Sequence, residues 1–560
     1  MSYKVALAEE QLKNCISTAL NNAIKNGELP EAQLPEFKIE IPADRSHGDY
    51  STNAAMAGAR VFRMAPAKIA EIIIKNIQLD GTYFKSVSVA GAGFINFILG
   101  ENYYGDILLD IDEKQDKYGH SNFGNGKRVL VEFVSANPTG PMHVGNARGG
   151  ALGDTLAEAL SWAGYYTERE FYINDAGNQI EKFGLSLDIR YRQTCGEDVE
   201  MPEDSYHGKD IIEHAENFRN AYGDKYMSAS ESERKKALVE FALPKNIEGL
   251  ERDLKAYRIV YDTWFKESSL HQNGEVKRII ELLKDSGYTY EAEDALWFKA
   301  TDFGCDKDFV LVRSNGIPTY IVPDIAYHYN KLAVRNFDMA IDILGADHHG
   351  YVPRLKAALT ALGLDADRLT VVLMQMVRLI NRDGEVIKAS KRSGKAITLV
   401  TLLEEVSTDA ARFVFNQREA NTHCDFNLDL AVEQSAQNPV YYCQYAHARI
   451  CSILKKLSDG EVKASSEQLN LLTDDSEKEL IRHLAGLTDE VIGSAKNLDP
   501  SRITRYAYDL SALFHKFYNS CRCDTEDADL RTARLFLCKC AKTVLANVLS
   551  LLKVEAPEQM

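Results

Sequence analysis

Residues 129–148 read VLVEFVSANPTGPMHVGNAR and place a single histidine in a Pro- and Gly-rich turn between an apolar run and a helical pattern. In a parallel sheet, such a turn presents a bound phosphate to the free amides at a helix N-terminus. Pro141 stiffens the turn, whereas Gly140 and Gly145 lack the Cβ that would obstruct a closely approaching phosphate. His143 projects beside that approach. The pattern predicts a phosphate-handling site, with an ordinary strand-to-helix turn as the alternative.

A glutamate, Glu132, interrupts the apolar run 129–134, which otherwise suits a strand buried on both faces. Burying an ionised carboxylate is costly unless a cation meets it. We therefore expect the end of this strand to bind a positively charged substrate.

A second segment, 380–398, reads INRDGEVIKASKRSGKAIT and predicts a hairpin with Asp383 and Gly384 in its turn. A basic run among small residues follows the hairpin. Its cations are Lys388, Lys391, Arg392 and Lys395. Such a run could neutralise phosphate charge, and the alternative is a solvated surface loop.

The elements that must position these residues form a doubly wound parallel sheet within 116–404. Helical stretches separate the strand candidates, which are 129–134, 167–173, 309–312, 340–344 and 371–376. The helix after the histidine turn is predicted over 147–163, because leucines recur there every three or four residues. Between about 185 and 290 the pattern is polar and helical.

The regions on either side differ from this alternation. Residues 1–115 predict an α+β domain with a helix over 6–25, strands over 37–42 and 86–99, and helices within 51–77. From about residue 405 strand signals are absent. Helical spacing over 402–416, 440–457, 476–496, 503–519 and 528–551 predicts a helical bundle. Most of the aromatic residues there should pack in its core, and a few beside basic groups could stack on unpaired bases.

Composition agrees with a multidomain protein of ordinary character. The 560 residues exceed what one core organises, and the net charge of −17 leaves room for local basic surfaces that bind a nucleic acid. No run of about 18 apolar residues suggests a membrane span, and no signal segment is apparent, so we expect a cytoplasmic protein.

Ten scattered cysteines favour reduced thiols. Two C-x-C pairs, Cys521 with Cys523 and Cys538 with Cys540, raise the alternative of a zinc site. Their spacing does not fit the usual C-x-x-C knuckle, and residues two apart on a helix diverge, so we expect no metal.

Two of these motifs resemble the signatures of class I aminoacyl-tRNA synthetases. Residues 143–146, HVGN, resemble the HIGH motif, and residues 388–392, KASKR, resemble the KMSKS motif. The words ANPTGPMHVGNARG, YINDAGNQI at 172–180, GADHHGYV at 345–352 and KASKRSG resemble the arginyl-tRNA synthetase family, and the similarity extends from the N-terminal region to the last residues. Asn146 departs from the second histidine of HIGH, and Ala389 from the methionine of KMSKS.

The resemblance implies a fold and an activity. It implies a Rossmann-like catalytic domain over 116–404 with a connecting insertion at about 185–290, an N-terminal domain over 1–115 for the tRNA elbow, and an anticodon-binding domain over 405–560. The enzyme would activate L-arginine with ATP, accompanied by Mg²⁺, and transfer it to the 3′-terminal adenosine of tRNA(Arg). By this resemblance we expect a monomer.

The resemblance also carries residue roles. The catalytic residues would be His143, Asn146, Lys388 and Lys391. ATP would contact Pro141, Gly145, Gly345, Asp347, His348, Met376, Val377 and Ser390. Arginine would contact Glu132, Asn137, Glu267, Tyr320, Asp324 and Gln375. Two alternatives stay open: Asp324 could cap a helix over 325–333, and the DHH triplet could ligate a metal.

Two other functions compete. A related nucleotidyltransferase, such as one resembling pantothenate synthetase, would form an adenylate without binding tRNA, and it would not need so large a helical C-terminal region. A catalytically silent tRNA-binding paralogue would be suggested by loss of His143 or Lys391, and both are present.

Overall fold

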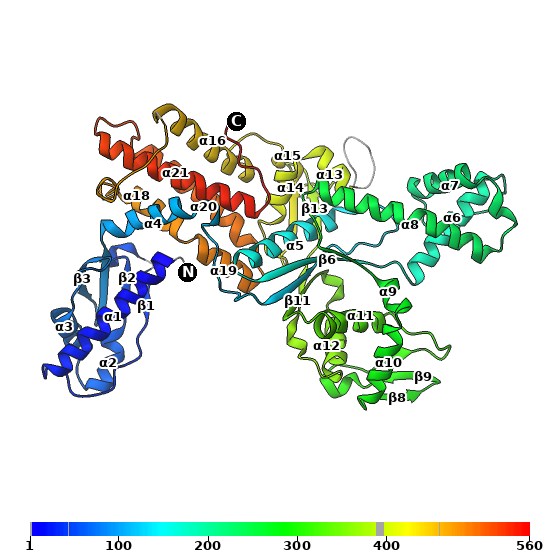
Figure 1. Cartoon of the computed structure of the whole chain (residues 1–560), viewed down its shortest axis with the longest axis horizontal. Helices are drawn as coiled ribbons and strands as arrows, with labels where there is room; N and C mark the ends of the chain where they lie inside the picture. Colours follow the sequence, from blue (N-terminus) through cyan, green and yellow to red (C-terminus); the bar gives the residue numbers. More distant parts are fainter. Residues whose placement is uncertain (1–2, 43, 388–396, 459) are drawn as a thin grey trace.

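The computed structural model describes residues 3–42, 44–387, 397–458 and 460–560. Figure 1 shows the N-terminal unit and the inserted helices α6 and α7 at opposite ends of the long axis, with the parallel sheet between them and the C-terminal helices along one side. None of the described helices is long and apolar enough to cross a membrane.

The N-terminal unit is an α+β domain, in which helices pack on a four-stranded antiparallel sheet of order β1-β2-β4-β3. Its elements are α1 (Tyr3–Lys25), β1 (Ile39–Glu40), β2 (Tyr50–Thr52), α2 (Ala54–Phe62), α3 (Pro66–Asn76), β3 (Phe84–Ala90) and β4 (Phe94–Leu99). The single strand predicted over 86–99 is wrong, because Gly91 and Gly93 take positive φ angles and turn the chain into a hairpin. Helix α4 (Glu101–Lys114) leads into the next unit.

The middle unit contains a five-stranded, wholly parallel sheet of order β12-β11-β5-β6-β7, which confirms the predicted α/β fold. The strands are β5 (Arg128–Glu132), β6 (Tyr166–Ile173), β7 (Thr263–Lys266), β11 (Met339–Gly345) and β12 (Leu369–Met374). Neighbouring residues of β11 face opposite sides: Ile341 packs in the core that holds helix α5 (Val144–Trp162), and Ala340 packs in the core that holds α11 (Ile321–Tyr329) and α12 (Val352–Ala361). Helices therefore cover both faces of the sheet.

One strand prediction in this unit was incomplete, and one strand of the parallel sheet was missed. Residues 309–312 do form a strand, β10 (Phe309–Val312), but it belongs to a separate antiparallel sheet with β8 (Thr289–Ala292) and β9 (Ala295–Phe298). The edge strand β7 lies inside the interval expected to be an insertion. Three of its four residues are partly buried and Lys266 is exposed, so they carry no strong strand pattern. Helices α9 (Glu267–Gln272) and α10 (Glu275–Asp285) follow it.

The inserted helices α6 (Asn178–Thr194), α7 (Lys209–Tyr222) and α8 (Glu231–Ala256) enclose a small core of their own around Phe183, Leu187 and Phe218. The basic run 234–236 lies here. Arg234 is buried against Asp188 and so serves this packing.

The C-terminal region is helical, as predicted. Its helices are α13 (Leu399–Glu405), α14 (Thr408–Phe415), α15 (Leu428–Ala431), α16 (Pro439–Leu457), α17 (Ser466–Leu469), α18 (Asp475–Ala485), α19 (Leu487–Asn497), α20 (Ser501–Ser520) and α21 (Ala528–Leu551). The expectation of no strand after residue 405 was wrong, because β14 (Cys424–Asn427) pairs in parallel with β13 (Val377–Ile380). A four-residue strand whose partner lies about 45 residues earlier leaves little local signal.

Candidate active site

The histidine turn joins the carboxyl end of β5 to helix α5, and His143 occupies the N-cap position of that helix. The backbone N–H of His143 donates to Oδ1 of Asn146 at 3.0 Å. The asparagine that departs from the HIGH motif therefore fixes the start of α5 through its side-chain oxygen, and its own N–H donates to the carbonyl of His143 at 2.9 Å. The N–H groups of Val144 and Gly145 precede the first regular helical bond and remain available for a ligand. The predicted helix is confirmed, and its N-terminus has the geometry that binds phosphate.

A cleft of about 570 Å³ opens in front of this turn. Its lining includes the predicted residues Asn137, Pro141, His143 and Asn146, together with Gly140. A Cβ added at Gly145 would meet no atom within 4 Å, so nothing in the protein fills the space beside that glycine. The opposite wall comes from the inserted helices and was not predicted. It includes Gln179, Tyr206, Asp210 and Ile211. Gln179 belongs to the word YINDAGNQI, whereas no motif distinguishes the other three in the sequence.

The basic segment 388–396, which contains Lys388, Ser390 and Lys391, lies outside the described residues. Its two flanks are described. Before it, the N–H of Ile387 donates to the carbonyl of Leu379 at 2.8 Å. After it, Thr398 forms an antiparallel bridge with His143, and the N–H of Leu399 donates to the carbonyl of Met142 at 2.9 Å. The chain that follows the basic segment is thus held against the histidine turn.

The residues expected to contact adenosine lie at the carboxyl ends of neighbouring strands. Gly345 ends β11, which pairs with β5, and Asp347 and His348 form an exposed turn directly after it. Met376 lies between β12 and β13 and is 75% exposed, and Val377 is the first residue of β13. Because strand ends meet at one edge of a parallel sheet, these residues and the histidine turn share that edge.

Glu132 is buried and has a cationic partner within the chain. Nζ of Lys331 lies 2.5 Å from Oε2 of Glu132 and 2.8 Å from Oδ1 of Asp342, and the hydroxyl of Ser135 donates to Oε1 of Glu132 at 2.9 Å. Glu132 was assigned to a substrate cation because a buried carboxylate needs a positive partner. That reason was wrong, because Lys331 of the chain already supplies the partner. The sequence alone gave no sign of this ion pair. Arginine contact by Glu132 stays a prediction without that support.

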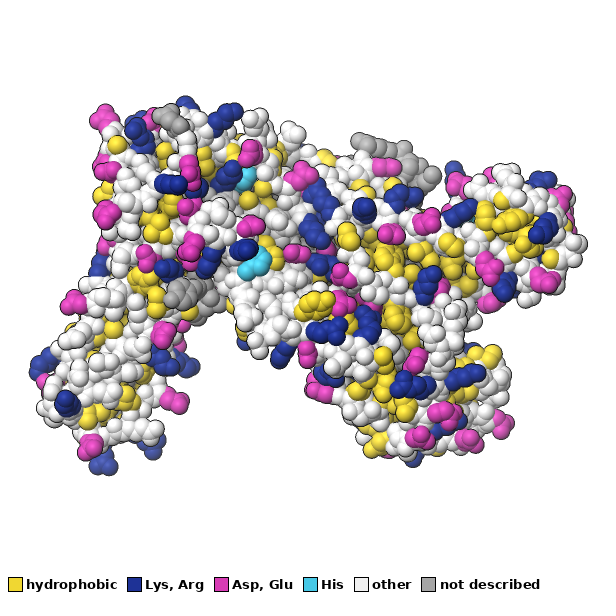
Figure 2. Space-filling model, viewed as in Figure 1, with side chains coloured by type: hydrophobic (Ala, Val, Ile, Leu, Met, Phe, Trp, Pro, Cys, Tyr) yellow, Lys and Arg dark blue, Asp and Glu magenta, His cyan; other side chains and the backbone are white. Residues whose placement is uncertain are grey.

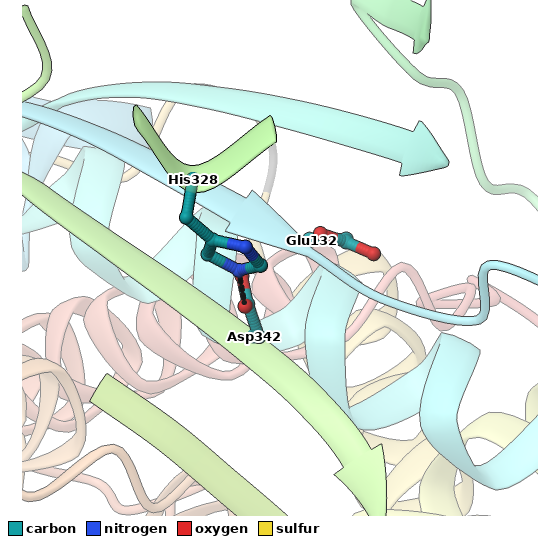
Figure 3. Close-up of side chains that lie close together, drawn as sticks. All are labelled: Glu132, His328 and Asp342. Carbon is teal, nitrogen blue, oxygen red and sulfur yellow. Dashed lines mark hydrogen bonds and ion pairs between the residues drawn. The ribbon is translucent and has the colours of Figure 1, made fainter. Parts of the chain in front are cut away.

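Figure 3 shows how Glu132, His328 and Asp342 converge. Nε2 of His328 lies 2.6 Å from Oδ2 of Asp342. These three residues form the one group of possible metal ligands that the described part of the chain contains. The Lys331 ammonium already contacts the carboxylates of Glu132 and Asp342. Burial opposes the charge of Lys331, but these two carboxylates raise its pKa. The arrangement therefore suits a buried lysine rather than a divalent cation.

Glu267 and Asp324 form a second pair of carboxylates, with a different environment. Burial and the nearby Asp324 raise the pKa of Glu267, and burial raises the pKa of Asp324 although the Tyr351 hydroxyl donates to it. Among the described residues, no lysine or arginine forms an ion pair with either carboxylate; His271 lies 3.7 Å from Glu267. Two partly buried carboxylates without a strong cation form a site that favours a bound cation.

Tyrosines surround this pair. The Tyr172 ring is buried and lies close to both carboxylates, and Tyr320, which is 67% exposed, stacks on Tyr351 with ring centroids 5.7 Å apart. Helix α11 begins at Ile321 with Tyr320 at its N-cap position, so the alternative role of Asp324 as an N-cap is wrong.

Gln375 contributes its backbone to the same region. Its carbonyl accepts from Nη1 of the buried Arg148 at 2.7 Å, and its N–H donates to Ala420 at 2.9 Å. Arg148 thereby ties helix α5 to the connection between β12 and β13. Contact between the side chain of Gln375 and arginine stays a prediction.

Helix α5 is also fixed at its middle by a buried carboxylate. Asp154 accepts from Arg412 of α14 at 2.6 Å, from Lys553 after α21 at 2.8 Å and from Arg169 of β6 at 2.9 Å. Burial alone would raise the pKa of Asp154, but these three cations hold it below its ordinary value. We refer to these four residues as the Asp154 cluster. The Asp154 cluster joins helix α5 to the helical C-terminal region.

A parallel sheet with a histidine-capped helix after its central strand, a cleft at that turn and a basic sequence motif whose following residues are held beside the turn define a class I aminoacyl-tRNA synthetase. Three family models match successive parts of the chain: the arginyl tRNA synthetase N terminal domain over 10–99, the tRNA synthetases class I (R) catalytic domain over 108–454, and the DALR anticodon binding domain over 443–560. The chain belongs to the arginyl-tRNA synthetase family.

Relatives match along the whole chain. The arginine–tRNA ligase of Ruminiclostridium cellulolyticum is 52% identical, with 98% of each chain covered, and that of Caldanaerobacter subterraneus subsp. tengcongensis is 53% identical, with 99% of each covered. The structure of Thermus thermophilus arginyl-tRNA synthetase superposes with a TM-score of 0.72 at 22% identity and covers all of both chains, which supports the shared fold.

Proposed function

We propose that this protein is an ATP-dependent arginine–tRNA ligase, which forms arginyl-adenylate and pyrophosphate and then transfers arginine to the 3′-terminal adenosine of tRNA(Arg). The observation that carries arginine selection is the pair Glu267 and Asp324, two partly buried carboxylates that no lysine or arginine among the described residues meets in an ion pair. A guanidinium presents paired N–H donors that match carboxylates, which a lysine ammonium cannot copy.

In activation, the arginine carboxylate attacks the α-phosphorus of ATP and pyrophosphate leaves, so the enzyme must orient both substrates and neutralise charge on phosphate oxygens. His143 and the first amides of α5 would hold the phosphates, and Asn146 keeps the turn in place through its bond to the His143 backbone. Lys388 and Lys391 would approach the departing pyrophosphate from the basic segment, whose far flank is bridged to His143.

Magnesium fits this scheme as a companion of ATP. It would neutralise phosphate charge while bound mainly to phosphate oxygens and water. The converging group at Glu132 is satisfied by Lys331, so Mg²⁺ would need no dedicated cage of protein ligands there. We further propose that the enzyme acts as a monomer in the cytoplasm.

The helical C-terminal region offers an aromatic cleft for tRNA. A hollow of about 420 Å³ is lined by Tyr441, Tyr442, Tyr445, Arg449 and His515. Rings that stack on unpaired bases, next to an arginine that contacts phosphate, are the usual means of single-strand recognition. Figure 2 shows basic and acidic side chains interspersed on the visible face, so local basic groups coexist with the net negative charge.

The first experiment is exchange of labelled pyrophosphate into ATP with each of the twenty amino acids, with and without total tRNA. We expect exchange with arginine alone, and negligible exchange unless tRNA is present. Exchange with another amino acid would refute the arginine assignment, and brisk exchange without tRNA would refute tRNA-dependent activation. A silent tRNA-binding paralogue would give no exchange under any condition.

Replacing Glu267 with glutamine should weaken arginine binding selectively, because it removes charge from a partly buried cation site. We expect the KM for arginine to rise about 30-fold or more, on the scale of a lost buried charge partner, while the KM for ATP changes little. Steady-state aminoacylation measures both values. Glu281→Gln, on the exposed face of α10, is the matched control and should match the parent enzyme. Equal effects on both substrates would contradict the role of Glu267.

A further inference from the structure

Four cysteines are buried where α20 ends and α21 runs back, but only two of them face each other. Cys521 and Cys523 follow α20, and Cys538 and Cys540 lie within α21. Sγ of Cys523 lies 3.8 Å from Sγ of Cys538. Cys521 instead contacts the Ser476 hydroxyl at 3.4 Å, and the Cys540 thiol donates to the Leu108 carbonyl at 3.3 Å. The two C-x-C pairs of the sequence therefore split, and the four sulfurs do not converge as zinc ligands would.

The pair is chemically unequal. The hydrogen bond from the Cys538 thiol lowers the pKa of Cys523, and the Arg534 guanidinium adds to this while burial opposes it. Arg534 is held in place by Glu477, at 2.7 Å, and by the carbonyl of Arg522, at 2.9 Å. The same hydrogen bond and burial raise the pKa of Cys538. Cys523 is thus the better nucleophile, since the thiolate is the reactive form.

Both thiols are buried, with Cys523 3% and Cys538 0% exposed, so a small oxidant reaches them only when the chain around them opens; the irregular segment beside the pair is the loop between α20 and α21. Cys523 lies in this loop, between the exposed residues Arg522 and Asp524, whereas Cys538 lies within α21. A disulfide requires a sulfur separation of about 2 Å. The sulfurs must therefore approach by a little under 2 Å, which a side-chain rotation and a small loop movement can supply because the loop has no regular secondary structure.

We propose that Cys523 and Cys538 form a reversible disulfide when the protein meets a peroxide. The Cys523 thiolate attacks one oxygen of hydrogen peroxide and breaks the O–O bond, giving a sulfenic acid and hydroxide. The Cys538 sulfur then attacks the sulfenic sulfur, forms the S–S bond and expels the second hydroxide, which takes up the Cys538 proton as water. A dithiol returns both cysteines to thiols through exchange.

The disulfide would link the loop at Cys523 to the middle of α21. Because this loop follows directly after α20, the bond would also restrict movement of the C-terminal end of α20. His515 and Asn519 of α20 line the aromatic cleft proposed for tRNA. The redox site stands on the thiol geometry alone, and its failure would leave the proposed synthetase activity intact.

The test uses the full-length protein, reduced and then treated with stepwise additions of hydrogen peroxide. Remaining thiols are alkylated, and peptides are analysed by mass spectrometry with and without dithiothreitol. We expect a cross-linked peptide that joins Cys523 to Cys538 and has lost two hydrogen atoms, protection of those two thiols from alkylation, and full recovery on reduction. The half-buried Cys451 provides the matched control, and Cys451→Ser should leave the cross-link unchanged.

Cys523→Ser and Cys538→Ala should each abolish the cross-link. Two variants are made so that the test still holds if one of them fails to fold. Circular dichroism verifies folding. The proposal is overturned if both thiols stay alkylatable after peroxide has oxidised other cysteines. It is also overturned if Cys523 proceeds to sulfinic acid without a cross-link, or if Cys523 pairs with a different cysteine.

Discussion

Replacing Lys391 with methionine is expected to reduce kcat for arginine activation by about 30- to 900-fold, equivalent to about 2 to 4 kcal/mol in the transition state. The reason is electrostatic: pyrophosphate leaves with accumulated negative charge, and the lysine ammonium is the cation that the KMSKS-like motif supplies. The lysine charge stabilises bound arginine and ATP less than it stabilises the transition state, so the KM values for both substrates should change much less. Pre-steady-state formation of the adenylate, in the presence of tRNA, measures the step directly.

The geometry behind this prediction comes from the flanks of the basic segment. The N–H of Leu399 donates to the carbonyl of Met142 and Thr398 forms an antiparallel bridge with His143, so the residues that follow the segment lie against the turn proposed to bind phosphate. Lys277→Met, an exposed lysine of α10, is the control and should retain parent activity. A Lys391→Met enzyme within threefold of the parent would contradict the assignment of this lysine to the transition state.

Replacing Asp154 with asparagine should have the largest effect on stability, lowering the free energy of unfolding by about 3 to 5 kcal/mol. The change leaves Arg412, which is fully buried, and the partly buried Lys553 and Arg169 without the carboxylate that they share. Urea denaturation followed by fluorescence measures the loss. Asp367→Asn removes an exposed ion pair with Lys356 instead and should leave stability almost unchanged.

The double variant Asp154→Asn with Lys553→Met should recover part of the loss, because one unpaired cation is removed as well. The parent contribution should also depend on pH. The folded-state pKa of Asp154 is lowered, so its stabilisation is present above the ordinary value of about 4 and is lost as the pH falls through the folded-state pKa. A single variant as stable as the parent would show that the Asp154 cluster contributes no net stability.

Much of the architecture follows from local pattern. Leucine spacing identified helix α5, and continuous helical periodicity identified α20 and α21 almost to their ends. The missed elements are those that depend on distant partners. Strands β7 and β14 have four residues each and exist because β6 and β13 pair with them. Their sequences alone contain no alternation long enough to indicate a strand.

The site shows the same division. The turn around His143 could be predicted, because its glycines, prolines and histidine occur together in the sequence. The partner of Glu132 could not, since Lys331 is about 200 residues away in the chain and lies in a one-turn π-helix that no motif indicates. Sequence reasoning correctly required a cation there, but it could not tell a substrate from a lysine of the chain.

The order of the parallel sheet has a consequence for the ribosome-bound chain. Strand β5 lies at the centre of the sheet, yet its neighbour β11 is synthesised about 200 residues later. Until β11 emerges, one edge of β5 has unpaired N–H and C=O groups next to apolar side chains, which is a surface prone to association with other chains. During that interval, a chaperone that covers the exposed edge of β5 would reduce association of the nascent chain with other chains.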